Sequence, residues 1–188
     1  MKTLTCLEVW KEMDSITTNG NIEFNYHRTI DMSDYLIETE LFPRNVLAAY
    51  TLWNLGKDLN PEQLSVFSDQ RGGGQGNYRE GITQKIDNVV DALQSFPRSK
   101  RAVITIPNNS FANHNNDDDA KCMREIHFRV DGNLINATVF FRAQAALIFP
   151  KNIHFIGSLM EEIGRRLTPT VKPGQLSYLA SILVNDRD

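Results

Sequence analysis

The chain has 188 residues, of which 41% are hydrophobic and 23% charged, and its net charge is −3. This balance is typical of a folded globular protein, and the length suits one domain with its own core. The small negative charge gives no basis for general binding to a nucleic acid polymer. We therefore expect a single domain over residues 1–188.

No apolar run approaches the roughly 20 residues that are needed to cross a bilayer, so no membrane partner is expected. The first fifteen residues carry charged side chains throughout and lack the apolar centre of an export signal. The two cysteines, Cys6 and Cys122, do not make a disulfide framework. We expect reduced thiols and a location in the cytoplasm.

The first half of the chain predicts helices. Residues 44–55 form an apolar helical segment, and residues 60–67 form a short second helix with proline at its first turn. Residues 71–76 (RGGGQG) form a flexible loop that lacks the signature of a phosphate-binding loop and is a candidate lid. A third helix starts near Ile82, repeats its apolar residues at helical spacing and ends at Pro97.

The second half of the chain predicts a sheet. Residues 102–106 and 122–130 are expected to be strands. The Asp131-Gly132 pair predicts a tight turn into a returning strand over residues 133–142.

One more helix, over residues 153–167, and a last strand, over residues 175–184, complete the pattern. The fold class is therefore α+β, with a mixed, mainly antiparallel β-sheet covered by two or three helices. The N-terminus around Cys6 is expected to be loose.

Cys122 is the candidate nucleophile. It opens a predicted strand, and the neighbouring Lys121 and Arg124 are cations that favour the thiolate. The alternative is that Cys122 is a small buried hydrophobic residue. The histidines carry no signature of a Cys–His pair, and we expect them to be ordinary surface or core residues; they are His27, His114, His127 and His154.

Three further features allow a functional and a structural interpretation. Arg101 and Arg142, on or beside strands, would form either salt bridges or a phosphate clamp. Asn152 would either cap the following helix or bind a base edge. Residues 115–119 (NNDDD) offer oxygen ligands for calcium or magnesium, but without the spacing of a known site we expect a solvated loop and no metal.

Four short segments, taken in order, resemble the thymidylate synthase and deoxycytidylate hydroxymethylase family. They are residues 99–103 (SKRAV) after a helix, Cys122 followed by residues 128–132 (FRVDG), residues 140–144 (FFRAQ) and residues 149–153 (FPKNI). The resemblance covers about residues 82–185 and implies a thymidylate synthase-like fold.

The resemblance also implies an activity. The Cys122 thiolate would add to carbon 6 of a pyrimidine nucleoside monophosphate, and a one-carbon unit from methylene-tetrahydrofolate would be added to carbon 5 as a methyl or hydroxymethyl group. Arg142 would bind the phosphate, and Asn152 would bind the pyrimidine edge, where asparagine goes with uracil in this family. Lys100 and Arg101 would reach the phosphate in a neighbouring subunit's site, which implies a homodimer. The implied nucleotide-binding residues are Lys100, Arg101, Arg142, Gln144 and Asn152.

The sequence departs from the family's pattern at several positions. The helix that carries the family's proton-relaying glutamate matches residues 44–55, where Tyr50 is present and no acid is. Met123 follows the candidate nucleophile in place of histidine. Leu183 and Asn185 occupy the positions at which the family has the histidine and tyrosine that bind the sugar. The alternative function is therefore that of a catalytically degenerate nucleotide-binding homologue or a dimeric scaffold.

Overall fold

A computed structural model describes residues 2–71, 77–107 and 121–185. Two predicted loops fall largely outside these ranges, namely residues 72–76 and the acidic segment 115–119, as does His114. None of the helices in the described ranges is both long enough and apolar enough to cross a membrane.

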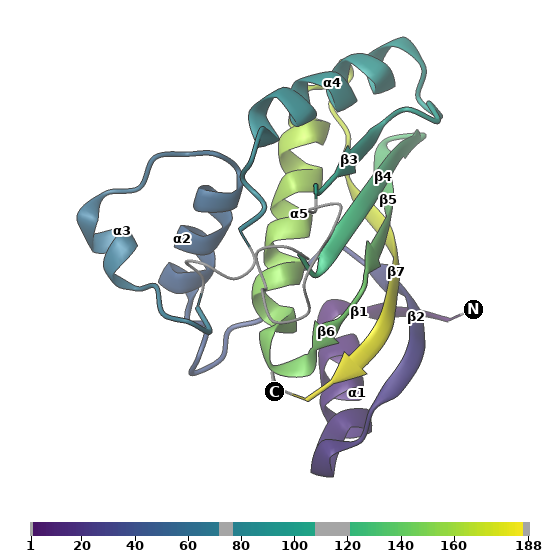
Figure 1. Ribbon diagram of the computed structural model, residues 1–188. Coiled ribbons are helices and arrows are strands. Elements are labelled where there is room, and N and C mark those ends of the chain that lie inside the picture. The colour runs from purple at the N-terminus through teal and green to yellow at the C-terminus, as the bar shows by residue number, and fades with distance from the viewer. Residues whose placement is uncertain (1, 72–76, 108–120, 186–188) are drawn as a thin grey trace.

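Within the described ranges, one mixed seven-stranded sheet runs through the molecule in the order β1-β2-β7-β5-β4-β3, with β6 also paired to β7 (Figure 1). The β2–β7, β3–β4 and β4–β5 pairs are antiparallel, and the β1–β2, β5–β7 and β6–β7 pairs are parallel. The predicted α+β class and mixed sheet are confirmed. The strands are β1 (Thr3–Thr5), β2 (Glu23–Asp31), β3 (Val103–Thr105), β4 (Met123–Asp131), β5 (Leu134–Phe141), β6 (Gln144–Ala145) and β7 (Lys172–Val184).

The four helices predicted from the sequence are present, and one more lies near the start of the chain. Helices α1, α4 and α5 pack against the sheet, and α2 packs against α5 (Figure 1). Helix α5 begins at Phe149, so Asn152 lies inside its first turn, and the interpretation of Asn152 as the cap of this helix is wrong. The helices are α1 (Cys6–Thr17), α2 (Arg44–Asn54), α3 (Pro61–Ser65), α4 (Ile82–Ser95) and α5 (Phe149–Arg166), with short 3-10 turns at Thr18–Gly20 and Ala146–Ile148.

The N-terminus is ordered by a helix cap, so the expectation of a loose terminus is wrong. The Thr5 hydroxyl accepts a hydrogen bond from the Glu8 backbone N–H at 3.2 Å, and the Glu8 carboxylate accepts one from the Thr5 N–H at 2.8 Å. Cys6 is fully buried at the start of α1. Burial, with the nearby charges of Asp34 and Asp31, raises the pKa of its thiol to about 12. Cys6 is thus a core residue and not a nucleophile.

The core lies between these helices and one face of the sheet. Alternate residues of β4, β5 and β7 point into it, as the period of two in a strand requires. The other face of β5 carries Leu134 and Phe140, each 37% exposed. The inward set is Ile126, Phe128, Ile135, Ala137, Val139, Phe141, Leu176, Tyr178 and Ala180.

The predicted hairpin between β4 and β5 is confirmed. Gly132 has φ of +61°, in the left-handed region that favours glycine in such turns. The hairpin fixes the register of the two strands, and this register decides which residues meet at their other ends.

Candidate functional site

The register of β4 and β5 brings Cys122 and Arg142 together. Met123 is paired with Phe141, so the residues just outside these strands are neighbours. The Arg142 backbone N–H donates to the Cys122 carbonyl oxygen at 2.9 Å. The Cys122 side chain is partly exposed at this end of the sheet. The candidate nucleophile and the candidate phosphate-binding arginine therefore lie side by side.

A second arginine adds positive charge at the same place. Arg124 is half-buried, and its pKa is lowered first by burial and then by the charge of Arg142. The charges of the two guanidinium groups therefore act on one another at this end of the sheet. Two arginines in one place are of the kind that binds a phosphate group.

A buried amide pair lies beyond these residues along the chain. The Asn152 Nδ2 donates to the Gln144 Oε1 at 2.9 Å, and the side chains are only 2% and 1% exposed. The Tyr178 hydroxyl donates to the same Gln144 oxygen at 2.6 Å. The Tyr50 hydroxyl lies 3.5 Å from the Asn152 Oδ1, as a long hydrogen bond. Four polar side chains, from α2, β6, α5 and β7, thus form one buried chain.

Tyr178 is bonded to the amide pair and lies within electrostatic reach of the Cys122 thiol. Its pKa is raised well above the usual range, chiefly by burial and then by the charges of Tyr78, Cys122 and Tyr26. The phenol therefore keeps its proton and acts as a donor, and the Cys122 thiol lies within electrostatic reach of it. We call this group the sheet-end site; it consists of Tyr50, Cys122, Arg124, Arg142, Gln144, Asn152 and Tyr178.

Lys151 lies directly beside this site and is fully buried. Its ammonium group donates to the Gln70 carbonyl at 2.8 Å and lies 5.0 Å from the centre of the Tyr50 ring and 5.9 Å from that of Phe42. Aromatic faces attract a cation electrostatically. Lys151 thus holds the segment before Arg71 against α5 and places a positive charge next to Tyr50.

No protein-family model and no curated protein matches the sequence. Among solved structures, the thymidylate synthase from T4 phage is similar, with a TM-score of 0.67 and 14% sequence identity over 93% of this chain and 74% of that chain. This chain has the thymidylate synthase fold. At this identity the similarity carries the fold alone, and activity has to be argued from the site.

Within this thymidylate synthase-like domain, Lys100 and Arg101 are not at the sheet-end site. Both are exposed in the connection between α4 and β3. The pairing of Val103 with His127 places that connection at the far end of β4 from Cys122. At about 3.3 Å per residue, the separation along the strand is roughly 20 Å. A role for these two residues at a site of this kind requires a second subunit, and it stays a prediction.

The described histidines are engaged away from Cys122, as the sequence predicted. Each has a polar partner of its own, and none of the three contacts the thiol within the described ranges. No group of three potential metal ligands occurs in the same ranges. The partners are the Ser177 hydroxyl for His27 at 2.9 Å, the Ser99 carbonyl for His127 at 3.0 Å and the Thr51 hydroxyl for His154 at 2.7 Å.

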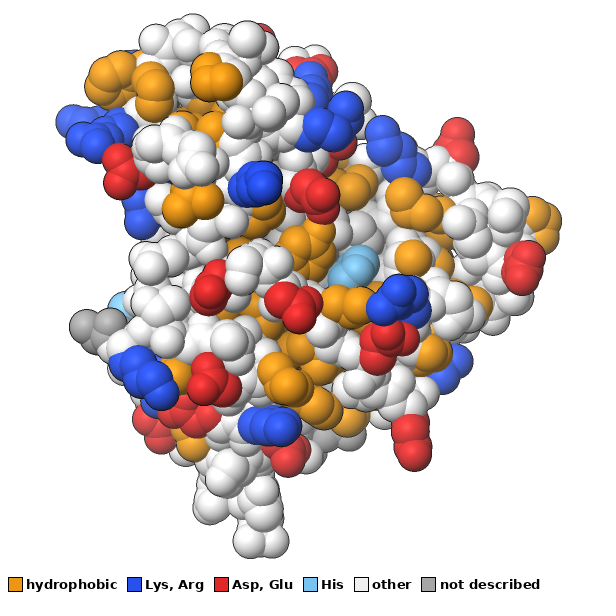
Figure 2. Space-filling view, turned by 180° about the vertical axis from the view of Figure 1, so that it is seen from behind, with side chains coloured by type: hydrophobic (Ala, Val, Ile, Leu, Met, Phe, Trp, Pro, Cys, Tyr) orange, Lys and Arg blue, Asp and Glu red, His pale blue; other side chains and the backbone are white. Residues whose placement is uncertain are grey.

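A cavity of about 910 Å³ lies on the opposite side of α5. Figure 2 shows it as a hollow with hydrophobic side chains and a histidine inside and charged side chains near its rim. None of the site residues predicted from the sequence lines it. We call it the α5 groove; it is lined by Met32, Ser33, Asp34, Tyr35, Leu36, Arg44, His154, Glu161, Arg165, Thr170, Val171, Lys172 and Pro173.

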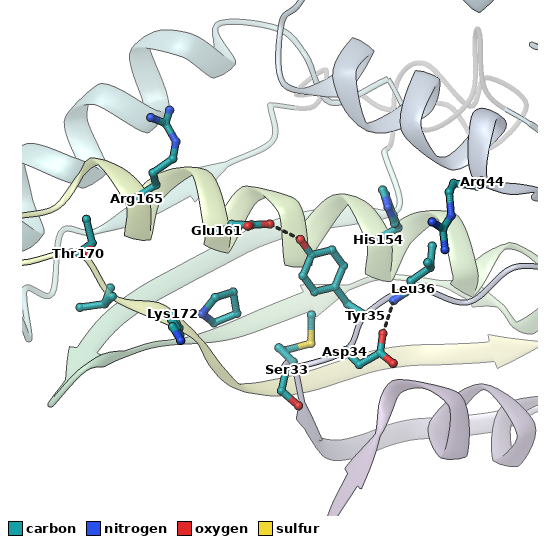
Figure 3. Close-up of a pocket in the computed structure, with 13 residues that line it drawn as sticks. Ser33, Asp34, Tyr35, Leu36, Arg44, His154, Glu161, Arg165, Thr170 and Lys172 are labelled. Atoms are coloured by element: carbon teal, nitrogen blue, oxygen red, sulfur yellow. Dashed lines mark hydrogen bonds between the residues drawn. The ribbon is translucent and has the colours of Figure 1, made fainter.

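Tyr35 occupies the centre of the α5 groove (Figure 3). Its hydroxyl donates to the Glu161 carboxylate, and its ring meets that of His154 edge-on, with centres 5.7 Å apart. The ring lies directly over Gly157, where a Cβ atom would come within 2.2 Å of it. Burial, and then the charge of Arg44, lower the pKa of His154 to about 4, so the imidazole is neutral at neutral pH.

Proposed function

We propose that this chain is a nucleotide-acting transferase that adds a one-carbon unit, as a methyl or hydroxymethyl group, to carbon 5 of a pyrimidine nucleoside monophosphate. The observation that carries the proposal is the partly exposed Cys122 beside Arg142, with the Gln144–Asn152 pair at the same end of the sheet. The thymidylate synthase fold supports it.

The chemistry assigns a task to each of these residues. The Cys122 thiolate forms a bond to carbon 6, and the electron pair of the ring double bond moves to carbon 5 and the adjacent carbonyl. Carbon 5 would then attack the electrophilic one-carbon unit of the donor. Loss of the carbon 5 proton and departure of the carrier would leave a methylene group on carbon 5. This group would take a hydride from the donor, giving a methyl group, or water with loss of a proton, giving a hydroxymethyl group, and expulsion of the thiolate would restore the ring double bond. Arg142 and Arg124 bind the phosphate, and Asn152 binds the base edge.

Methylene-tetrahydrofolate is the donor that the family resemblance implies. We propose it as the one-carbon donor, and the titrations with and without folate described below test this assignment.

A second candidate is a protein that binds the nucleotide without turnover. The observation that favours it is that α2 brings a tyrosine hydroxyl, and not a carboxylate, to Asn152. Two other acids near this region, Glu80 and Glu125, are exposed to solvent. Proton relay by a positioned group typically contributes roughly 10²–10⁴ in rate, so its loss would leave binding without efficient chemistry.

We also propose that the chain forms a homodimer through the outer face of its sheet. Leu134 and Phe140 project from that face of β5 and are exposed in the single chain. A second subunit would cover them and could bring its own Lys100 and Arg101 to this chain's site. Light scattering should give the mass of two chains, and Phe140→Asp should give that of one. A monomeric wild-type protein would contradict this part of the proposal.

The proposed function is tested by calorimetric titration with uridine and cytidine monophosphates in ribo and deoxy forms, with and without folate. At least one nucleotide should bind. Arg142→Met should weaken its binding by roughly 10- to 100-fold, since it removes a charge-assisted contact to phosphate. Arg98→Met is the matched control, because Arg98 is exposed and paired with Asp131 at 2.8 Å. Absence of binding to all four nucleotides would contradict both candidate functions.

A further inference from the structure

We propose that Gln144 is a positioning residue that fixes the orientation of the Asn152 amide and thereby determines which pyrimidine base the site accepts. The inference rests on the proposed function and deepens it. It assigns base discrimination to a hydrogen-bond chain that runs from Tyr178 through Gln144 and Asn152 to Tyr50.

The orientation of Gln144 is the first step. Its Nε2 donates to the Ala145 carbonyl at 2.6 Å, and its Oε1 accepts from the Tyr178 hydroxyl at 2.6 Å. A carbonyl oxygen can only accept, so a reversed amide would place two oxygens against one another at Ala145. Tyr178 stays protonated because its pKa is raised by burial. Gln144 therefore presents an oxygen, and not an NH₂ group, to Asn152.

The orientation of Asn152 follows from that of Gln144. Its Nδ2 faces the Gln144 oxygen at 2.9 Å, and its Oδ1 faces the Tyr50 hydroxyl at 3.5 Å. Rotating the Asn152 amide by 180° would oppose its Oδ1 to the Gln144 oxygen, whereas the Tyr50 hydroxyl could accept from Nδ2 as well as it donates to Oδ1. Both amides are almost fully buried, so two opposed oxygens without a donor between them are costly. The chain thus holds Asn152 in one orientation.

An amide that is fixed in one orientation distinguishes the two pyrimidines by their different patterns of hydrogen-bond donors and acceptors. Uracil presents a donor at N3 and an acceptor at position 4, and cytosine presents an acceptor at N3 and a donor at position 4. An amide that can rotate pairs with either base, whereas a fixed amide pairs with only one. Within the described ranges, Asn152 retains one N–H and one lone pair that have no protein partner.

The test is the ratio of calorimetric affinities for the uridine and cytidine monophosphates. Wild-type protein should prefer one of them by roughly 10- to 100-fold, the usual value of a correct bidentate pair over a mispaired one. Gln144→Met keeps the length of the side chain and removes the acceptor, so the ratio should fall to within about 2-fold. Gln94→Met is the matched control: Gln94 is exposed on α4 and bonded to Thr168, and the ratio should not change.

A second variant keeps the inference testable if Gln144→Met does not fold, which thermal unfolding would show. Tyr178→Phe removes the hydroxyl that donates to the Gln144 oxygen and leaves the Ala145 carbonyl as the remaining group that orients Gln144, so the ratio should fall by about 3-fold. An unchanged, wild-type ratio in both variants would overturn the inference. If only Tyr178→Phe folds, an unchanged ratio in that variant would overturn it. Equal wild-type binding of both bases would also overturn it and would leave the proposed function standing. If the wild-type protein binds neither nucleotide, the proposed function fails first and the inference fails with it.

Discussion

Helix α5 separates two regions that differ in almost every physical respect. On one side, Asn152 belongs to a chain of polar side chains that are nearly fully buried and bonded to one another. On the other side, His154 and Glu161 line a cavity of about 910 Å³ that is open to solvent (Figure 3). Residues 152, 154 and 161 are all on one helix, and the rotation of 100° per residue puts the first on the face opposite the other two.

The α5 groove and the sheet-end site differ in the groups that they offer to a ligand. Two polar side chains that line the groove already have protein partners, since Arg44 pairs with Glu38 and the Tyr35 hydroxyl donates to Glu161. The sheet-end site holds a thiol, two arginines and an oriented amide at the end of one sheet. Buried polar groups that are mutually satisfied resist reorientation, and this is the property that recognition of a base requires.

The largest effect is expected for Cys122→Ala at the sheet-end site. It should reduce turnover by more than about 10³-fold, since no other described group could form the bond to carbon 6, and leave thermal stability within about 1 kcal/mol. Steady-state kinetics and thermal unfolding measure the two quantities.

Cys6→Ala is the matched control for that variant, and the reverse result is expected. Its thiol is fully buried, so the substitution should lower stability by roughly 1 kcal/mol and leave turnover per folded molecule unchanged. Activity that survives Cys122→Ala would show that the proposed mechanism is wrong.

The next largest effect is expected on stability, from the packing of the Tyr35 ring against Gly157 of α5. Gly157→Ala should destabilise the fold by roughly 1–3 kcal/mol, because a Cβ atom would lie 2.2 Å from the Tyr35 ring. In a Tyr35→Ala background the same change should be neutral or stabilising by up to about 1 kcal/mol, as alanine is the better helix former. Urea unfolding of the four proteins gives the coupling, and equal costs in both backgrounds would refute this packing arrangement.

A smaller effect is expected from the pH dependence of His154. Its pKa in the folded protein is about 4, below the usual value near 6.5, so the unfolded chain binds the proton more readily between these values. Stability should therefore fall as the pH falls from about 6.5 to about 4, on the order of 2 kcal/mol from this group. Urea midpoints of wild type and His154→Gln, compared across this range, isolate the contribution. Parallel pH profiles of stability for the two proteins would contradict this contribution from His154.

The smallest effect is expected for Glu161→Gln in the groove. The substitution weakens the bond from the Tyr35 hydroxyl at an exposed position, which should cost at most about 1 kcal/mol. Nucleotide affinity should be unchanged, since the groove and the sheet-end site lie on opposite faces of α5. A change of affinity of 10-fold or more would show that the two regions are coupled.

Local patterns in the sequence predict much of this fold. The helix spacing of residues 82–93 and the Asp131-Gly132 turn are signals within a few residues of one another, and both elements formed as expected. The N-terminal helix was missed although its signal was present. Thr5 and Glu8 have the spacing of a capping box, and a buried Cys6 fits the core face of the helix that follows.

The candidate site was predicted in part. Cys122, Arg142, Gln144 and Asn152 were selected from short motifs, and the structure brings them to one end of the sheet. The hydroxyl partners were not selected, because Tyr178 is 34 positions from Gln144 and Tyr50 is 102 positions from Asn152. Contacts at such separations depend on the pairing of β5 with β7 and the packing of α2 on α5, which no local pattern specifies.

The α5 groove could not be predicted for the same reason. Tyr35 reaches it from the segment after β2, and Glu161 reaches it from α5, with 126 positions between them. The one local signal was Gly157, a glycine within an otherwise regular helical pattern. Such a glycine often indicates that another group packs closely against the helix.

If Cys122 is a nucleophile toward a pyrimidine ring, a mechanism-based nucleotide should become covalently bound to it. The protein would be incubated with a 5-fluorinated uracil nucleotide, with and without methylene-tetrahydrofolate, and analysed by intact mass and peptide mapping. We expect an adduct on the peptide that contains Cys122 in the wild-type protein and in Cys6→Ala, and none in Cys122→Ala. A wild-type protein that binds the nucleotide but forms no adduct would contradict this role of Cys122 and support the binding protein without turnover.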